Sequence, residues 1–263
     1  MTYQAMSYEL REGVAWITIN RPASLNAMDL PAMEEFLDIA NRVSTERRVR
    51  AALITGAGDK AFCAGGDVAG FAAAGEEAPL LLQRMTAAYH MAISRLAWMR
   101  APVIGAVGGV AAGAGLSLVA ACDLVVASEK ARFTSAYTGI GLSPDGSGTW
   151  FLSRIIGTRR ATELFLTNRT LSAAEALDWG LVNQVVPPEA LLEKAGALAT
   201  GLAQGPTEAH GMVKKLLQMA PQDSLEGQME REARGIAAMA MTADGKEGVR
   251  AFAAKRRPVF RGE

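Results

Sequence analysis

The segment GLSPDGSGTW, residues 141–150, places a single carboxylate, Asp145, among small and turn-forming residues. Pro-Asp-Gly favours a tight turn in which the Asp145 side chain would have no chemical role. Aspartate also caps the N-termini of helices, and the apolar residues from Trp150 to Ile156 have helical spacing. A third interpretation is a general base that a loop presents to a substrate. These ten residues alone leave all three interpretations open.

Two other segments rich in glycine could bind an anion. CAGGDV (residues 63–68) and AAGAGLSL (residues 111–118) each follow an expected strand and precede residues that can form a helix. Backbone N–H groups at such a position carry partial positive charge, and small side chains let a ligand oxygen approach them. Two such turns facing each other would form an oxyanion hole from main-chain donors alone. Close packing of the backbone would explain the same glycines without any function.

Several other chemistries lack the residues that they need. The glycines between residues 108 and 115 do not have the G-x-G-x-x-G spacing of a dinucleotide site, and the sequence has no P-loop lysine, C-x-x-C pair or G-x-S-x-G elbow. His90 and His210 are the only histidines, so a histidine-based metal site lacks ligands. We therefore expect neither a bound metal nor a separate cofactor.

The composition indicates an ordinary globular protein of 263 residues, half of them apolar. Its 27 basic residues balance its 27 acidic ones, so no net field would attract nucleic acid or an anionic membrane. The two cysteines, Cys63 and Cys122, exclude a disulfide framework, and the first residues show no signal-peptide pattern. We expect a cytoplasmic protein whose partners include neither nucleic acid nor a membrane.

The hydrophobic pattern predicts an α/β fold, because buried strands alternate with amphipathic helices. Short apolar runs predict strands at 13–19, 51–55, 102–107 and 123–128. Helical spacing predicts helices at 31–43, 81–98, 206–219, 224–241 and 245–254, and a helix of small residues that ends near 121. We expect residues 1–204 to form the core domain with the active site. Residues 205–263 should form a helical region whose apolar faces pack on other subunits.

Five motifs, in order along the chain, resemble the enoyl-CoA hydratase/isomerase (crotonase) superfamily. They are ITINRPASLNAM, KAFCAGGDV, PVIGAVGGVAAGAGLSLVAACDLVVAS, GLSPDGSGTW and LSAAEALDWGLVNQVVP, and the resemblance continues to AFAAKRRPVF at 251–260. It implies a crotonase-like core of repeated ββα units and a helical C-terminal region for oligomerisation into homotrimers or dimers of trimers. It also implies acyl-CoA thioester substrates, of which coenzyme A is itself a part.

The resemblance assigns roles to residues within these motifs. The N–H groups of Gly66 and Ala114 match the donors of the family's oxyanion hole, although glycine is more frequent at the second position. Asp145 falls where isomerases of 3-enoyl thioesters and of phenylacetate-type intermediates keep their base. Lys255 and Phe260 would help to hold the adenine and phosphates of CoA, on the same or a neighbouring subunit. Further substrate contacts are expected at Leu25, Ala27, Ala64, Gly65, Asp67, Val68, His90 and Tyr137. For His90 and Tyr137, ordinary packing is an open alternative.

Departures from the family pattern favour one reaction. Hydratases of the family carry two glutamates where this chain has Ser117 and Tyr137. The 4-chlorobenzoyl-CoA dehalogenases match Asp145 as nucleophile and have a histidine at the place of His90. They differ by a tryptophan at the place of Tyr137 and an aromatic residue at that of Gly66. The sequence therefore favours an acyl-CoA isomerase that shifts a double bond through an enolate. A dehalogenase, a hydratase and a non-catalytic CoA-binding protein stay open.

Overall fold

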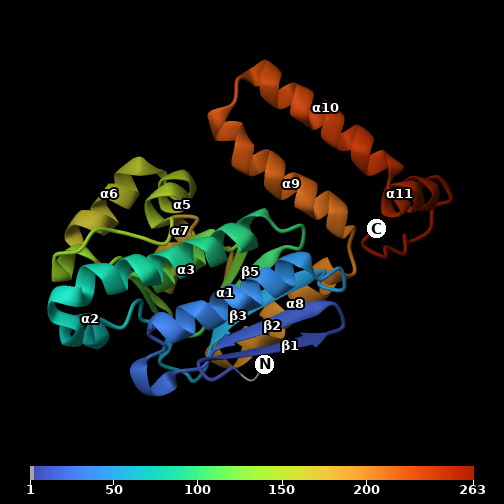
Figure 1. Cartoon of the computed structure of the whole chain (residues 1–263). Coiled ribbons are helices and arrows are strands. Elements are labelled where there is room, and N and C mark those ends of the chain that lie inside the picture. Colours follow the sequence, from blue (N-terminus) through green and yellow to red (C-terminus); the bar gives the residue numbers. More distant parts are fainter. Residues whose placement is uncertain (1–2) are drawn as a thin grey trace.

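The computed structural model describes residues 3–263 and contains two β-sheets (Figure 1). In the larger sheet β1 is antiparallel to β2, and the other neighbouring strands are parallel. Its strands, in spatial order, are β1 (Met6–Arg11), β2 (Val14–Ile19), β3 (Ala51–Gly56), β5 (Val103–Val107), β7 (Leu124–Ser128) and β10 (Gln184–Val186). The smaller sheet consists of β4 (Ala61–Cys63), β6 (Val110–Ala112), β8 (Arg132–Thr134) and β9 (Leu171–Ser172).

The strands of the two sheets alternate along the chain. A strand of the larger sheet is followed by a strand of the smaller one and then by a helix: β3–β4–α2, β5–β6–α4 and β7–β8–α5. The helices are α2 (Val68–Ala74), α4 (Ala114–Ala121) and α5 (Gly148–Ile155). The expected core of repeated ββα units is therefore confirmed.

Long helices cover both faces of the larger sheet. On one side α1 (Leu30–Thr45) packs against α3 (Ala78–Trp98), and all eight residues of α4 are buried near them. On the other side α8 (Leu191–Ala203) packs on β3, β5 and β7. Two shorter helices, α6 (Gly157–Thr167) and α7 (Ala173–Asp178), complete this part of the chain.

Three C-terminal helices project from the core (Figure 1). They are α9 (Thr207–Met219), α10 (Leu225–Met241) and α11 (Ala243–Ala253), and they confirm the predicted helices. In α9 the buried Lys214 forms an ion pair with Asp123 at 2.7 Å and donates to the carbonyls of Leu96 and Ala101. This ion pair fixes α9 to the core. None of the helices within residues 3–263 is long and apolar enough to cross a membrane.

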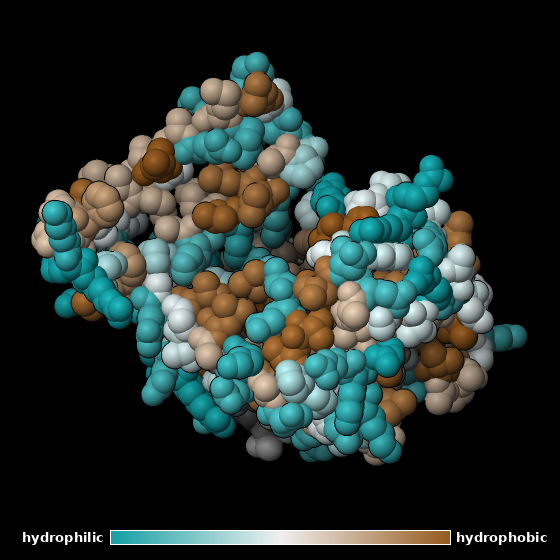
Figure 2. All heavy atoms as spheres, turned by 180° about the vertical axis from the view of Figure 1, so that it is seen from behind, coloured by the Kyte–Doolittle hydropathy of each residue, from teal (hydrophilic) through white to brown (hydrophobic). Residues whose placement is uncertain are grey.

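Apolar side chains are exposed along these projecting helices. Figure 2 shows such residues on the helices and on the part of the core next to them. They include Val213, Leu217, Leu225, Met229, Ile236, Met241, Val249 and Phe252. A role of residues 205–263 in oligomerisation, and a domain boundary at 204, stay predictions.

A close backbone contact joins β4 to the start of α4. A Cβ atom at Gly115 would lie 2.1 Å from the carbonyl oxygen of Cys63. Real Cβ atoms do not approach an oxygen so closely, so only glycine allows this contact. The contact holds the two glycine-rich turns of the sequence side by side.

Gly115→Ala should therefore destabilise the protein, by about 2–3 kcal/mol, because the backbone of β4 or α4 must move. Gly201 in α8 is the matched control, because a Cβ atom there meets nothing within 4 Å. Gly201→Ala should stabilise the helix by about 0.5–1 kcal/mol. Urea unfolding followed by circular dichroism measures both changes. Equal free energies of unfolding for Gly115→Ala and the wild type would contradict the proposed role of Gly115.

Candidate active site

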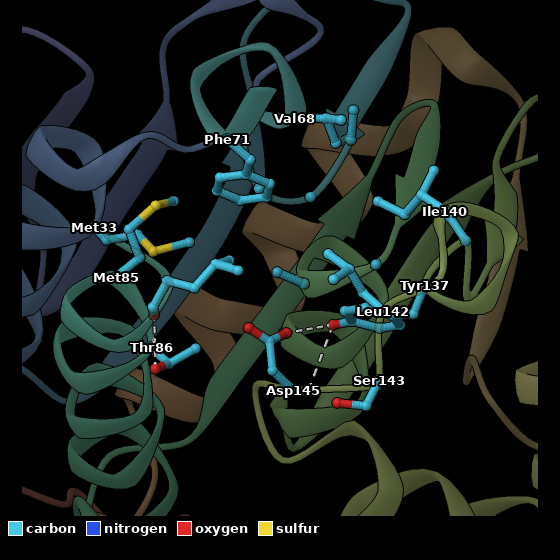
Figure 3. Close-up of a pocket in the computed structure, with 17 residues that line it drawn as sticks. Met33, Val68, Phe71, Met85, Thr86, Tyr137, Ile140, Leu142, Ser143 and Asp145 are labelled. Carbon is cyan, nitrogen blue, oxygen red and sulfur yellow. Dashed lines mark hydrogen bonds between the residues drawn. The ribbon is translucent and has the colours of Figure 1, made fainter. Parts of the chain in front are cut away.

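A cavity of about 220 Å³ opens where the two glycine-rich turns meet (Figure 3). One part of its wall comes from these turns and from α1, α2 and α3, and the other from the segment 136–145. Among the residues that line it, Asp145 is the single one with an acidic or basic side chain. Most of the other lining residues are apolar, so the cavity offers one carboxylate in a largely apolar wall.

The two turns bring two backbone donors to the cavity. A Cβ atom at Gly65 would lie 3.5 Å from the nitrogen of Ala114, so the turns are in direct contact. Gly66 and Ala114 both line the cavity, and Ala114 is the first residue of α4. Within residues 3–263, neither of their N–H groups donates to an acceptor of the protein. Two unpaired N–H donors in one cavity, one of them at the start of α4, can hold an oxyanion.

A hydrogen bond from the buried hydroxyl of Tyr89 fixes the start of α4. Tyr89 is fully buried and donates to the carbonyl oxygen of Ala114 at 2.6 Å. Burial raises the pKa of Tyr89 well above its ordinary value, so the hydroxyl keeps its proton and remains a donor. The peptide between Ala114 and Gly115 is therefore oriented from the core, directly after the peptide that carries the Ala114 N–H.

The segments 25–28 and 64–67 run side by side at the rim of the cavity. Ala64 N–H donates to the carbonyl of Leu25, Met28 N–H to that of Gly65, and Asp67 N–H to that of Met28. Of the residues expected to contact CoA in these segments, Ala64, Gly65 and Val68 line the cavity.

Leu25, Ala27 and Asp67 lie outside the cavity wall. Leu25 is exposed, and the carbonyl of Ala27 accepts from the guanidinium of Arg21. The Asp67 carboxylate caps α2 by accepting from Gly70 N–H at 3.3 Å and lies 3.8 Å from Arg21. Asp67 thus has a structural role of its own, and its contact with substrate stays a prediction.

Asp145 lies in a tight turn and does not cap a helix. Its carbonyl accepts from Gly148 N–H at 3.1 Å, and Gly146 and Ser147 between them have φ of 61° and 63°. Helix α5 begins after Ser147, so the interpretation of Asp145 as an N-cap is wrong. The turn uses the backbone of Asp145, while its side chain points into the cavity (Figure 3). The turn and the proposed base are compatible.

Two hydroxyl groups hold Asp145. Tyr137 donates to its Oδ1 at 2.5 Å, and Ser117 donates to its backbone carbonyl at 2.9 Å. The two hydroxyl oxygens are 3.2 Å apart. Each hydroxyl has one proton, and these two bonds use both. Burial, and then the Asp145 carboxylate, raise the pKa of Tyr137, which therefore remains protonated and donates to the carboxylate. Tyr137 also lines the cavity, as expected.

His90 lies behind the Asp145 turn instead of at the cavity wall. Its Nε2 accepts from the N–H of Gly146 at 3.0 Å. The ring lines a second cavity, between α3, α5 and the end of α9, together with Trp150. His90, on α3, thus binds the backbone of the turn, and this hydrogen bond supports the turn. Contact between His90 and a substrate stays a prediction.

Lys255 and Phe260 follow α11, which lies at the end of the molecule opposite α2 (Figure 1). Phe260 packs against Gly248, and its carbonyl accepts from Arg50 at 3.2 Å. Lys255 is exposed just after α11. A single chain does not bring these two residues to the cavity, so their contact with CoA across subunits stays a prediction.

Sequence reasoning missed much of the apolar wall. Helices α1, α2 and α3 contribute Met33, Phe71, Leu82, Met85 and Thr86. Their helical spacing is the same whether a side chain fills the core or lines a cavity, so no sequence signal separates the two cases. Within residues 3–263, no cluster of three or more histidine, cysteine, aspartate or glutamate side chains could hold a metal ion.

The model of the enoyl-CoA hydratase/isomerase family matches residues 9–263. The chain is 38% identical over 256 residues to 1,2-epoxyphenylacetyl-CoA isomerase of Escherichia coli (strain K12), with 97% of each chain covered. It is 36% identical over 241 residues to 4-chlorobenzoyl coenzyme A dehalogenase-2 of Arthrobacter sp, covering 89% of this chain and 84% of that protein. A crystal structure of enoyl-CoA hydratase from Bacillus anthracis has a TM-score of 0.93 at 34% identity, covering 99% of this chain and 100% of that one.

The chain therefore belongs to the enoyl-CoA hydratase/isomerase family, as its motifs indicated. It is an acyl-CoA enzyme with the crotonase fold. The relatives carry the names of three different reactions, so the name of the family does not select among them.

Both cysteines should be unreactive in the folded protein. Burial raises the pKa of the Cys63 thiol to about 12, and burial together with Asp123 raises that of Cys122. The reactive thiolate is therefore almost absent at pH 8. We expect no reaction with a disulfide reagent such as DTNB in the native state and reaction of both cysteines in denaturant. Rapid native labelling that is absent in Cys63→Ser would contradict a purely structural role for this thiol.

Proposed function

We propose that the protein is an acyl-CoA isomerase that converts a 3-enoyl thioester into the conjugated 2-enoyl thioester. One observation carries the proposal: the single carboxylate of the cavity, Asp145, lies in the same cavity as the unpaired N–H groups of Gly66 and Ala114. This arrangement offers one base and one oxyanion site. It suits a reaction that removes and returns a proton.

The two N–H groups would bind the thioester oxygen and stabilise the negative charge that develops on it. The proton on C2 then becomes acidic, and Asp145 removes it through Oδ2, because Oδ1 accepts from Tyr137. The electrons of the broken C–H bond delocalise over the dienolate. Asp145 returns the proton to C4, and the double bond moves from C3–C4 to C2–C3. Atoms and charge balance without a further reactant.

Water addition has less support. The positions of the two hydratase glutamates hold Ser117 and Tyr137, and both hydroxyl protons already serve Asp145. With Asp145 as its single carboxylate, the cavity has no second one to orient or protonate water. A dehalogenase would use Asp145 as a nucleophile, and the Arthrobacter relative keeps that alternative open. A homotrimeric or hexameric assembly and a cytoplasmic location are also proposals.

Asp145→Asn should lower kcat by about a hundred- to ten-thousand-fold, because the amide cannot accept the proton. Proton NMR of 3-hexenoyl-CoA in D₂O measures conversion to the 2-enoyl thioester and deuterium at C4. Asp178→Asn is the control, because Asp178 is an exposed carboxylate that does not line the cavity. Full activity of Asp145→Asn would exclude Asp145 as the base. No conversion by the wild type, with halide release from 4-chlorobenzoyl-CoA, would indicate the dehalogenase instead.

Ala114→Pro should remove one oxyanion donor and leave the fold intact. Ala114 is the first residue of α4, where proline is tolerated because this N–H has no partner within the helix. We expect kcat for 3-hexenoyl-CoA to fall by about a hundred- to a thousand-fold. Leu225→Pro, at the exposed first residue of α10, controls for the substitution itself. Normal kcat in a folded Ala114→Pro variant would remove Ala114 from the mechanism.

A further inference from the structure

In the cavity Tyr137 and Asp145 lie together, and apolar side chains form most of the remaining wall (Figure 3). Tyr137 and Asp145 lie on one side. Met33, Phe71 and Met85 lie across from them. The hydroxyl of Thr86 donates to the carbonyl of Leu82 within its own helix, so it offers little polarity to a ligand. A substrate must therefore place its reacting carbons beside Asp145 and the rest of its acyl group against hydrocarbon.

The ring of Phe71 marks where the acyl group passes. A Cβ atom at Gly66 would lie 2.7 Å from Cζ of Phe71, so the ring lies directly against Gly66. Gly66 supplies one of the proposed oxyanion donors. An acyl group whose carbonyl lies at that donor therefore runs beside Phe71 and toward the two methionines. Flexible thioether side chains adapt to acyl groups of different shape.

The size of the cavity limits the length of the acyl group. A cavity of about 150 Å³ in another protein binds benzene. At the same packing, a volume of about 220 Å³ holds about eight carbon atoms. A longer chain would have to leave the cavity and would gain nothing from its apolar wall.

The charges of the cavity limit the chemistry of the acyl group. Within residues 3–263 no lysine, arginine or histidine lines the cavity, and Asp145 is the one charged residue in its wall. A carboxylate at the far end of an acyl group would be buried without a cation and would be repelled by Asp145. Burying an unpaired charge is strongly unfavourable.

Resting on the proposed function, we infer that the substrates are thioesters of uncharged hydrocarbon acyl groups of up to about eight carbons, linear or cyclic. Acyl groups with a terminal carboxylate are excluded. The apolar wall of Met33, Phe71, Leu82 and Met85 determines this selectivity.

Calorimetric titration of the wild-type protein with saturated CoA thioesters tests the inference, because these compounds cannot isomerise. Affinity should rise about fourfold per methylene from butanoyl- to octanoyl-CoA and then stay level to dodecanoyl-CoA. Hexanoyl-CoA should bind at least about a hundred-fold more tightly than adipoyl-CoA, which has a carboxylate in place of the terminal methyl group. Adipoyl-CoA binding as tightly as hexanoyl-CoA, or a steady rise to dodecanoyl-CoA, would overturn it.

A pair of leucine variants on α3 locates the selectivity. Leu82 lines the cavity and is only partly buried, so Leu82→Ala leaves the core intact. It should raise the affinity for dodecanoyl-CoA relative to octanoyl-CoA by severalfold. Leu80→Ala, at an exposed position outside the cavity, should leave this ratio unchanged. An unchanged ratio in Leu82→Ala would remove Leu82 from the selectivity.

The binding and NMR assays separate this inference from the proposed function. Selective binding with no conversion of 3-hexenoyl-CoA would refute the isomerase and support the acyl selectivity. Conversion of 3-hexenoyl-CoA with no selectivity in binding would support the isomerase and refute the inference.

Discussion

The close approach of Gly115 to the carbonyl of Cys63 is the constraint on which the site depends. It joins the last residue of β4 to the start of α4, and so it brings the turn of Gly65 and Gly66 against Ala114. Each turn by itself exposes one backbone N–H group. Their contact places two such groups in one cavity, where together they can bind an oxygen anion. Larger side chains at these turns would keep the two donors apart.

The second half of the site is a carboxylate held in place by its neighbours. A turn positions the backbone of Asp145. The hydroxyl of Ser117 donates to its backbone carbonyl, and that of Tyr137 donates to one of its carboxylate oxygens. His90 supports the same turn from behind. A base held in this way loses little freedom when substrate binds, and this preorganisation favours catalysis. Ser117 and Tyr137 thus stand where hydratases of the family carry two glutamates, and here both hydroxyls donate to Asp145.

The sequence pattern predicted the long elements well. Helices expected at 31–43 and 81–98 are present as Leu30–Thr45 and Ala78–Trp98, because their apolar stripes span several turns. Strands β1 and β10 and the strands of the smaller sheet were not predicted individually. Strands such as Ala61–Cys63 contain three residues, too few to show a period, and they form only because a neighbouring strand pairs with them. Repeated ββα units were expected from the family resemblance alone.

By itself the sequence determined the helices with long apolar stripes, the buried strands, the glycine-rich turns and the family to which they belong. The motifs also pointed to Gly66, Ala114 and Asp145 as a group. Only the tertiary structure decided that Asp145 faces the cavity, that His90 lies behind it, and that α1, α2 and α3 supply the apolar wall. Spacing along a chain reports which residues share one face of an element. Which face meets a cavity depends on packing between elements that are distant in sequence.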